Sequence, residues 1–399
     1  MRKEVVIFLG SSGFPFGSAT IQRQIQLAKS LIEAGFGVIV LNKRGAHSKF
    51  ITGREKITTH NYFQGIEYLY SSIITFRPKS FVTRNTFKFI GIFLQFFAIL
   101  YFRLFKNAKY IFNNSVNLKD LKYHYFLSQI FGMELIYDYV ELVSTLGKRG
   151  KNNFESVNSS FDIEFVKYTD KLIVISSFIE EYINKVDPNK PKVKIPPIID
   201  FSFSDGIEPE MDIDAFFLFC ASIAYEDVIR FIIEVFIGSR AIEKGFQLKL
   251  VINGSEEELK ILNDFILQKK ANQNIKVLSK LTYTDLIYQY KTARALLIPI
   301  SNNLQDQARF PFKICEYTAS KRPIITSDSG AITEFFENEF TAFIAKTEDS
   351  ADFIQKLNLV ISEPRLADRV GLNGYSLGKN YFNYNKYNEI LKNLLHDGK

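Results

Sequence analysis

Short apolar runs alternate with longer amphipathic segments along almost the entire chain, and this alternation limits the possible folds more than any other feature. Near the start, the apolar run 5–9 leads into a Gly/Ser-rich turn at 10–17. Residues 20–34 then place apolar side chains at helical spacing, and a second apolar run follows at 38–41. Because neighbouring parallel strands are joined by a crossover that is usually a helix, this pattern predicts an α/β fold built on parallel sheets.

The alternation runs twice, which indicates two domains. The first series of strands and helices ends near residue 186, and a second series begins at 216. The segment between them, 187–214, is rich in Pro, Asp and Glu and has little periodicity, so we expect it to hold the last strand of the first domain and the linker. A length of 399 residues is also about right for two domains of ordinary size.

Composition and charge exclude several classes of protein. The net charge is +7, but no block of five or six like charges occurs, so we expect no nucleic-acid-binding tail. Cys220 and Cys315 lie in apolar runs, and no Cys/His spacing typical of a metal site exists, so no metal or cofactor is predicted. The opening sequence MRKEVVIFLG has a short apolar run and no cleavage signature, which predicts a strand rather than a signal peptide and hence a cytoplasmic location.

The most hydrophobic stretch, FIGIFLQFFAILYF at 89–102, leaves three interpretations open. Basic residues flank it: Lys88 before, and Arg103, Lys106 and Lys109 after. Basic flanks and many aromatic residues suit a helix that lies on an anionic membrane surface. A helix buried inside a domain fits equally well, whereas a spanning helix needs about 20 apolar residues and is the weakest of the three.

The segment 308–330, ARFPFKICEYTASKRPIITSDSG, carries the clearest chemistry. Glu316 stands inside an apolar helical pattern, a position where a carboxylate is unusual. The pattern Arg-x-Pro-x-Lys-x-x-Glu-Tyr resembles the donor-binding motif of glycosyltransferase family 4, a retaining GT-B family, in a branch common in bacterial polysaccharide enzymes. The resemblance implies that Glu316 accepts hydrogen bonds from both ribose hydroxyls of a nucleotide, and that Pro311 and Phe312 also lie at the donor.

Further segments resemble the same family in the same order. The Gly-rich loop after the first strand would place backbone amides near the donor phosphates. The sequence YDYVE at 137–141 looks like an acidic motif on the acceptor side, and implies a catalytic role for Glu141. The remaining donor-binding positions implied by the resemblance are Gly17, Ser18, Gly254, Ser279, Lys280 and Gly330.

The resemblance covers nearly the whole chain and implies a GT-B fold, with two Rossmann-like domains facing each other across a cleft. Residues 1–200, with a C-terminal helix at 381–399 packing back on them, would form the acceptor-side domain, and 201–380 the nucleotide-sugar-binding domain. The implied activity is retaining, metal-independent transfer of a hexose-type sugar from a nucleotide-sugar donor to a glycan or lipid-linked acceptor. We expect a role in bacterial surface polysaccharide biosynthesis, in the cytoplasm or on the inner face of the cell membrane.

Three positions depart from the family pattern. Ala308 replaces the first of two acids spaced eight apart, and Ser222 and Asp227 stand where an Arg and a Lys normally neutralise the pyrophosphate. We therefore hypothesise that Arg309 and Lys313, four residues apart, supply the missing positive charge as catalytic residues. The alternative from a different class is a non-catalytic GT-B protein that acts as a partner in a polysaccharide assembly complex.

No general base is evident in the first domain. Of the four histidines, His47 follows the second predicted strand and could reach the active site, although a surface-loop position is the simpler interpretation. The resemblance implies a front-face retaining transfer, in which the leaving phosphate assists the acceptor and no separate base is required.

Overall fold

The computed structural model describes residues 3–17, 19–47, 57–146, 160–209 and 215–397. The chain divides into two compact units. Unit 1 contains Met1–Leu146, Asn153–Ile199 and Tyr384–Lys399, and unit 2 contains Asp200–Asn383. Each unit has its own sheet and its own hydrophobic core.

The described part of unit 1 is built on an eight-stranded sheet with the order β3-β4-β2-β1-β5-β6-β7-β8. All neighbours are parallel except β3 and β4, which form an antiparallel hairpin at one edge. The inner strands are buried along almost their whole length, as expected where helices cover both faces. The strands are β1 (Val5–Leu9), β2 (Gly37–Asn42), β3 (His60–Phe63), β4 (Ile66–Tyr70), β5 (Ala108–Asn113), β6 (Glu134–Tyr139), β7 (Lys171–Val174) and β8 (Lys192–Lys194).

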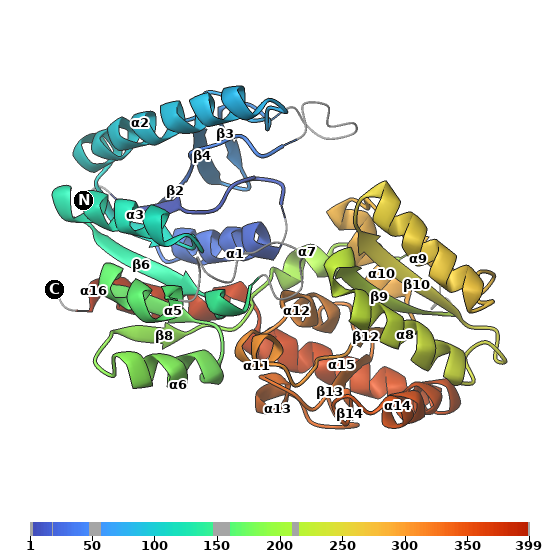
Figure 1. Cartoon of the computed structure of the whole chain (residues 1–399). Helices are drawn as coiled ribbons and strands as arrows, with labels where there is room; N and C mark the ends of the chain where they lie inside the picture. The colour runs from blue at the N-terminus through green and yellow to red at the C-terminus, as the bar shows by residue number, and fades with distance from the viewer. Residues whose placement is uncertain (1–2, 18, 48–56, 147–159, 210–214, 398–399) are drawn as a thin grey trace. The chain divides into compact units, whose positions relative to one another are not determined.

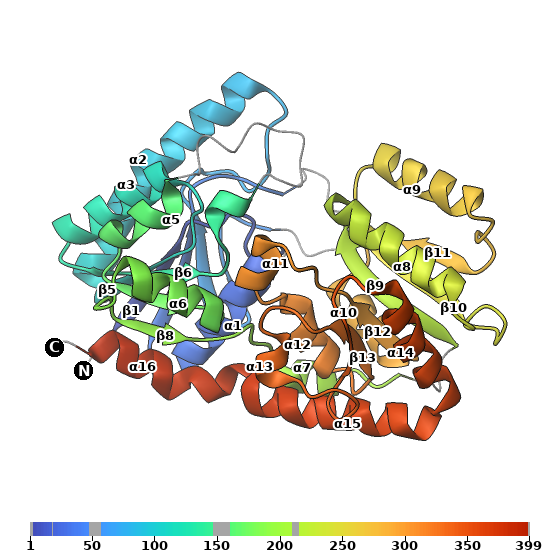
Figure 2. The same ribbon diagram turned by 60° about the horizontal axis from the view of Figure 1, so that its bottom comes forward.

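Helices cover both faces of this sheet. The C-terminal α16 packs beside α1 and β8 on one face (Figure 2), although almost the whole of unit 2 separates α16 from the rest of unit 1 in sequence. On the other face, α3 packs on β5 and β6, and α2 packs on β5 (Figure 1). The helices are α1 (Ala19–Glu33), α2 (Phe81–Phe105), α3 (Leu118–Ile130), α5 (Phe161–Glu164), α6 (Ser177–Val186) and α16 (Asn388–His396), with short 3₁₀ segments η1 (Val143–Thr145), η2 (Phe165–Tyr168) and η4 (Tyr384–Tyr387).

The apolar stretch at 89–102 belongs to α2, which is longer than the stretch itself. Only Gly91, Gln95, Ile99 and Phe102 of its residues are buried, so the interpretation as a fully buried helix is wrong. Among the described residues, α2 is the one helix long and apolar enough to cross a membrane by length and composition.

A buried ion pair ties α1 to the centre of the unit 1 sheet. Arg23 on α1 donates to both carboxylate oxygens of Asp138 on β6 at 2.8 Å. It also donates to the main-chain oxygens of Ile195 (3.0 Å) and Pro196 (2.8 Å). Both side chains of the pair are less than a tenth exposed. Asp138 is part of the acidic motif at 137–141, and its carboxylate serves the packing of this unit.

A second buried polar group lies where β2 and β5 end. His124 on α3 is fully buried, and its Nδ1 lies 2.9 Å from Nδ2 of Asn113. Nearby, the Lys43 ammonium lies 2.5 Å from the Asp120 carboxylate. Burial and the Lys43 charge lower the pKa of His124 to about 3, although the Asp120 charge acts in the opposite direction.

The buried imidazole predicts a pH-dependent stability. An unfolded histidine titrates near pH 6.5, whereas folded His124 stays neutral down to a pKa of about 3, so its stabilising contribution is complete above pH 6.5 and is lost as the pH falls. Between pH 7 and pH 5 we expect a loss of about 2 kcal/mol in the free energy of unfolding from this residue. Urea denaturation at a series of pH values measures it. The variant His124→Phe should show a flatter dependence over this range, and an unchanged slope would contradict the assignment.

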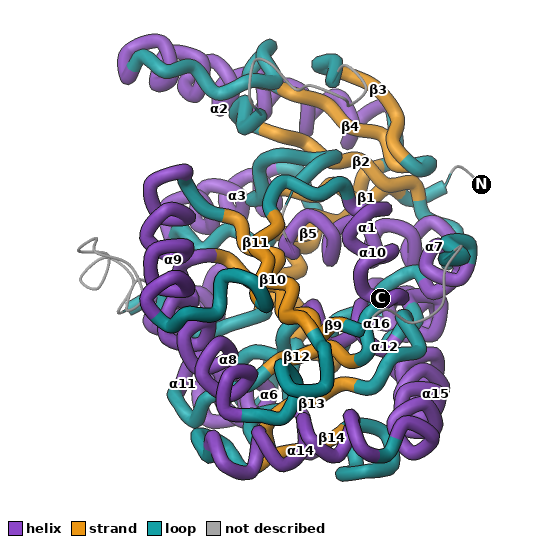
Figure 3. Tube along the Cα trace, turned by 90° about the vertical axis from the view of Figure 1, so that its right-hand side faces the viewer, coloured by secondary structure: helices purple, strands orange, loops and turns teal. Residues whose placement is uncertain are grey.

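Unit 2 has a six-stranded, all-parallel sheet with the order β11-β10-β9-β12-β13-β14. In sequence order within the unit this is 3-2-1-4-5-6, the order of dinucleotide-binding folds. Figure 3 shows the strands as a layer with α8 and α9 on one face and α10 and α12 on the other. The strands are β9 (Phe216–Ser222), β10 (Gln247–Asn253), β11 (Ile275–Leu278), β12 (Ala295–Ile298), β13 (Ile324–Ser327) and β14 (Phe343–Ala345).

The helices of unit 2 follow the predicted alternation, with two exceptions. The segments α7 and α11 are short helices in stretches that the sequence pattern left irregular. The helices are α7 (Phe201–Asp205), α8 (Glu226–Gly238), α9 (Glu256–Gln268), α10 (Tyr283–Thr292), α11 (Leu304–Ala308), α12 (Phe312–Thr318), α13 (Ile332–Phe335), α14 (Ser350–Ser362) and α15 (Pro364–Tyr381), with the 3₁₀ segment η3 (Ile223–Tyr225).

Candidate functional site

The strand order of unit 2 locates its candidate site. Connections leave β9 and β12 in opposite directions, so their carboxyl ends open a crevice where ligands bind in such sheets. A pocket of about 880 Å³ lies at these ends. Its wall includes η3 and the first turns of α8, the loop 299–303 after β12, and Ser327 at the end of β13.

The charges around this pocket do not favour a pyrophosphate inside it. Four carboxylates line the described part of its wall, those of Glu226, Asp227, Glu258 and Glu348, against the single guanidinium of Arg230. Arg230 is itself paired with Glu226 at 2.6 Å. Asp227, where the family pattern expects a cation, is therefore part of an acidic wall, and any cation that serves the donor has to come from elsewhere.

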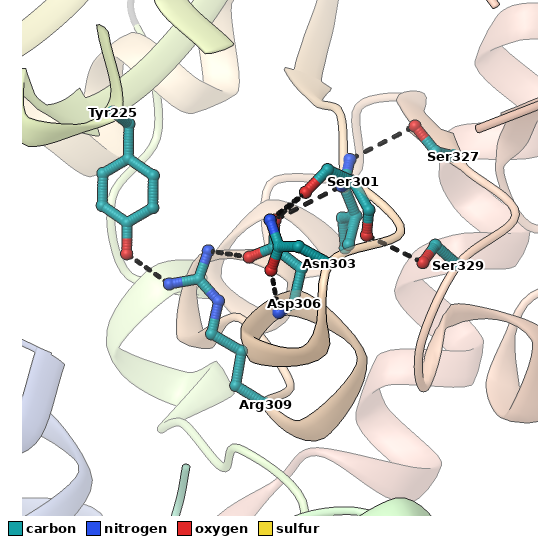
Figure 4. Close-up of polar contacts among 8 residues, drawn as sticks. Tyr225, Ser301, Asn303, Asp306, Arg309, Ser327 and Ser329 are labelled. Carbon is teal, nitrogen blue, oxygen red and sulfur yellow. Dashed lines mark hydrogen bonds and ion pairs between the residues drawn. The ribbon is translucent and has the colours of Figure 1, made fainter. Parts of the chain in front are cut away.

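Arg309 follows α11 and reaches Tyr225 at the end of η3 (Figure 4). Its guanidinium donates a hydrogen bond to the Tyr225 hydroxyl and lies 4.9 Å from the centre of that ring. On its other side, it forms an ion pair with Asp306 at 2.6 Å. The Asp306 side chain is 3% exposed, so the Arg309 charge has a buried counter-ion within three residues.

Asp306 is fixed by the loop after β12. It accepts hydrogen bonds from the Ser301 hydroxyl at 2.5 Å and from the Asn303 amide at 3.1 Å (Figure 4). Ser329 in turn donates to the main-chain oxygen of Ser301 at 3.0 Å. These contacts hold Arg309 in one orientation, since its partner carboxylate is bound on several sides.

Lys313, on the first turn of α12, lies among three groups that favour its charged form. Burial alone would lower its pKa, but the surrounding Cys220, Glu316 and Tyr225 outweigh burial and raise the pKa of Lys313. The Arg309 guanidinium therefore contacts the Tyr225 side chain, and Lys313 lies near the same side chain. Arg309 is paired with Asp306, whereas Lys313 lies near Glu316 in the next turn of α12. That these two cations serve one ligand stays a prediction.

Glu316 is buried one turn further along α12. The hydroxyl of Tyr290 lies 3.5 Å from Oε2 of Glu316, and the hydroxyl of Tyr283 is also a hydrogen-bond partner. Burial raises the pKa of Glu316, whereas Lys313 and the two tyrosine hydroxyls act to lower it. The carboxylate is therefore held by hydroxyl donors, the same kind of group that a ribose would present.

The other predicted donor residues of unit 2 lie on the loops that follow its strands or at the start of α12. Pro311 precedes α12 and Phe312 begins it. Gly254, Ser279 and Lys280 follow β10 and β11, and Lys280 adopts a left-handed backbone with φ +57°. Gly330 has φ +58°, and a Cβ there would lie 2.9 Å from the main-chain oxygen of Asp306. Glycine at 330 thus lets the loop after β13 pass against α11.

The predicted site residues of unit 1 that the structure describes lie on the loops that follow its strands. Gly17 is exposed in the loop after β1, and Ser18 lies outside the described residues. Glu141 is half-buried, just after β6. His47 lies in the loop after β2 and is half-buried, with its Nε2 2.8 Å from the Tyr70 hydroxyl.

Four residues of the cluster were absent from the sequence prediction. They are Tyr225, Asp306, Tyr283 and Tyr290, and each is an ordinary surface or core residue by its local pattern. The only signal that could have found them is the strand order, because it brings the ends of β9 and β12 together with α10 and α12.

Among the described residues, no group of three or more His, Cys, Asp or Glu side chains could hold a metal ion, and Cys220 and Cys315 are both free and buried.

Comparison with known structures defines the fold. The chain matches sucrose-phosphate synthase from Thermosynechococcus elongatus with a TM-score of 0.75, at 14% identity, over 98% of each chain. It matches Anabaena Alr3699/HepE in complex with UDP and glucose with a TM-score of 0.69, at 13% identity, over 99% of each chain. A glycosyltransferase from Rickettsia africae matches with a TM-score of 0.70, at 16% identity, over all of both chains. The predicted fold class is confirmed: two parallel-sheet α/β domains of the GT-B type.

A family model matches most of the second unit. Residues 203–377 match the family "Glycosyl transferases group 1". Unit 2 therefore carries a region that matches this family of glycosyl transferase domains, and the resemblance inferred from Glu316 and its neighbours is confirmed at the level of the family. The family match and the structural neighbours together support glycosyltransferase function. No curated protein sequence matches the chain significantly.

Proposed function

We propose that this chain is a retaining glycosyltransferase that moves a sugar from a nucleotide-sugar donor to a glycan or lipid-linked acceptor. The observation that carries the proposal is Glu316, a buried carboxylate held by the hydroxyls of Tyr283 and Tyr290 on a group 1 glycosyl transferase domain. A structural neighbour, HepE, was solved with UDP and glucose, which supports a nucleotide-sugar donor.

In this proposal Glu316 binds the donor ribose. Its two oxygens can accept from two adjacent hydroxyls, which would replace contacts now made by tyrosine hydroxyls. Tyr290 is at the long limit of a hydrogen bond, at 3.5 Å, so its replacement costs little. Exchange of one hydroxyl for another leaves the buried carboxylate paired throughout.

Lys313 is the residue we assign to the donor phosphates. Its raised pKa keeps it charged, and developing negative charge on a leaving diphosphate requires such a cation when Ser222 and Asp227 supply none. Arg309 has its own counter-ion in Asp306, so we expect a smaller electrostatic contribution from it and a role in orienting Tyr225.

The transfer we propose is metal-independent and keeps the anomeric configuration. The bond between the anomeric carbon and the diphosphate oxygen breaks, and the acceptor hydroxyl oxygen bonds to that carbon on the same face. The hydroxyl proton passes to the departing diphosphate, so no separate base is required. We further propose a role in bacterial surface polysaccharide biosynthesis, at the cytoplasmic side of the membrane.

The acidic pocket favours one alternative from a different class. Four carboxylates stand beside the crevice, including Asp227 where relatives are expected to carry a cation. A GT-B protein that has lost donor binding and acts as a partner in a polysaccharide assembly complex would tolerate this charge.

Donor binding separates the two proposals. A thermal-shift screen of the pure protein against UDP-, GDP-, ADP-, CMP- and dTDP-linked sugars should give an increase in melting temperature with one nucleotide class, with or without Mg²⁺. A ligand at 100 times its Kd stabilises the folded state by about 2.7 kcal/mol. Glu316→Gln keeps the shape of the side chain but removes its charge, and should weaken donor binding by about 10- to 100-fold, since hydrogen bonds to charged groups contribute about 1.5–3 kcal/mol.

The matched control is Glu334→Gln, an exposed acid on the same unit. It should bind the donor as well as the wild type does. No shift with any donor at millimolar concentration would move the assignment to the non-catalytic partner, whereas a shift retained in Glu316→Gln would remove the role given to this residue.

A further inference from the structure

Positive charge is concentrated in one segment of unit 1. Between Glu67 and Asp120 the sequence has no acidic residue and eight basic ones. The whole chain carries a net charge of +7, so the rest of it is close to neutral. This segment contains all of α2, and none of its residues lines the pocket of unit 2.

Three of these eight cations, together with Arg44, line a single cavity. A pocket of about 450 Å³ in unit 1 is lined by Arg44, Arg77, Arg84 and Lys88, and none of the described residues that line it is acidic. Arg44 donates through Nε to the Ser12 hydroxyl at 3.0 Å. A concave site with several cations and no carboxylate suits a phosphate or diphosphate group.

The backbone around this pocket is closely packed, so the site is a built feature rather than a chance grouping of surface side chains. A Cβ at Gly45 would lie 2.1 Å from the main-chain oxygen of Phe76, and one at Gly91 would lie 2.0 Å from that of Lys43. Ser71 donates to the main-chain oxygen of Gly91 at 2.9 Å. These contacts join the loop after β2, the segment after β4 and the helix α2, which together carry the four cations.

The outward face of α2 is apolar along its length. Phe89 is 73% exposed and Phe93 is 58% exposed, whereas the buried face includes the polar Gln95. A helix on the surface of a soluble protein normally buries its apolar side chains and exposes its polar ones. The exposed apolar side chains recur at about every fourth position, which we call the α2 stripe: Phe89, Phe93, Phe97, Tyr101, Leu104 and Phe105.

The helix is held to unit 1 at several points, which favours lying on a membrane over crossing it. Tyr123 on α3 donates to the main-chain oxygen of Ile92 at 3.1 Å. Near the other end, Arg103 donates to the main-chain oxygen of Phe131 at 2.7 Å, and the rings of Phe96 and Phe131 lie 5.3 Å apart. A spanning α2 would lose all of these contacts.

We propose that unit 1 docks on a membrane through the α2 stripe, and that the neighbouring cationic pocket receives the phosphate of a lipid headgroup in that membrane. The pocket and the stripe share α2: Arg84 and Lys88 line the pocket, and Phe89 begins the stripe one residue later. Apolar burial at the interface and attraction between Arg or Lys and anionic lipid act together in such binding. The lipid is the carrier of the acceptor, a statement that rests on the proposed glycosyltransferase function.

Vesicle flotation of the full chain tests the proposal without any donor. The vesicles are phosphatidylcholine alone, phosphatidylcholine with phosphatidylserine, and phosphatidylcholine with phosphatidic acid at matched surface charge. We expect the tightest binding to phosphatidic acid, whose headgroup is a phosphomonoester. Arg77→Gln with Arg84→Gln should weaken that binding by about 30-fold and bring it to the level of phosphatidylserine.

Two further variants separate the pocket from the stripe. Lys167→Gln with Lys185→Gln removes the same charge from exposed positions of unit 1 that do not line the pocket, and should leave the lipid preference intact. Phe89→Ser with Phe93→Ser should weaken binding to every vesicle by about 10-fold or more. Retained binding in the phenylalanine variant, or an equal loss in both charge variants, would overturn the proposal.

Three other outcomes are also decisive. If inorganic pyrophosphate binds the wild type in calorimetry but vesicles with phosphatidic acid do not, the ligand is a soluble phosphate and the membrane assignment fails. If sodium carbonate does not release the bound protein, α2 spans the bilayer and the docking mode is wrong. Lipid binding without any response to nucleotide sugars would keep this inference, and would count against the proposed function alone.

Discussion

Replacing Arg23 by Met should lower the free energy of unfolding by about 3–5 kcal/mol, because it leaves Asp138 buried without its counter-charge. The variant also loses the two hydrogen bonds that Arg23 donates to the main-chain oxygens of Ile195 and Pro196, which directly follow β8. Chemical denaturation followed by circular dichroism measures the change, and unit 1 should unfold at a lower denaturant concentration than in the wild type.

A surface ion pair gives the matched control. Arg230→Met breaks the pair between Arg230 and Glu226 on α8, which is exposed and of the i, i+4 type. Such a pair contributes about 0.3–0.5 kcal/mol, so the control should unfold close to the wild type. The double variant Arg23→Met with Asp138→Leu removes both buried charges and should recover part of the loss. Equal effects of Arg23→Met and Arg230→Met would mean that the buried pair is not important for stability.

Replacing Lys313 by Met should reduce turnover by about 100- to 1,000-fold, the range seen when one preorganised electrostatic contact to a developing charge is removed. The physical reason is that Lys313 is the cation beside Tyr225 and Glu316 that the proposal assigns to the leaving diphosphate. The loss should fall on kcat and on kcat/KM alike, since the contact strengthens as charge develops. Steady-state kinetics with the donor identified by the thermal-shift screen measures it.

Lys313 also neutralises a buried carboxylate, so a structural effect has to be separated from a catalytic one. Lys313→Met leaves Glu316 buried beside the tyrosines without a cation, and should lower stability. Lys313→Met with Glu316→Gln removes both charges and should regain stability. Because Glu316→Gln itself weakens donor binding, the turnover of the double variant is compared with that of Glu316→Gln alone, and it should be about 100- to 1,000-fold lower. Lys276→Met, at an exposed position on β11, is the control and should be active. If the double variant turned over as fast as Glu316→Gln alone, Lys313 would have only a structural role.

The sequence predicted the elements of unit 2 well because each strand there is a short apolar run bounded by turn residues. In the sequence, FFLF at 216–219, LKLVI at 248–252 and ALLI at 295–298 are such runs, and all three lie within observed strands. The hairpin of β3 and β4 was not predicted, since β3 is almost entirely exposed and its alternation is weak. The short α11 was also missed, because its five residues give no helical period.

The candidate site was predicted unevenly for a similar reason. Glu316 and Lys313 were found because an acid and a base inside an apolar helix are unusual in a local pattern. Tyr225 and Asp306 were not, because their importance depends on contacts between segments far apart in the sequence: Tyr225 follows β9, whereas Asp306 and Arg309 follow β12. The ion pair between Arg309 and Asp306 could not be predicted from the sequence either, and it changes the role expected of Arg309.

The sequence by itself determined the class of fold, the division into two series of strands and helices, and the family of the second unit. These properties follow from the period of apolar residues and from a short motif, which local composition carries directly. Only the tertiary structure decided which face of α2 is buried, where the cations of unit 1 meet, and which partners hold Arg309 and Glu316. A periodicity shows that a helix has an apolar side, but whether that side lies against a sheet or against solvent depends on what the rest of the chain places beside it.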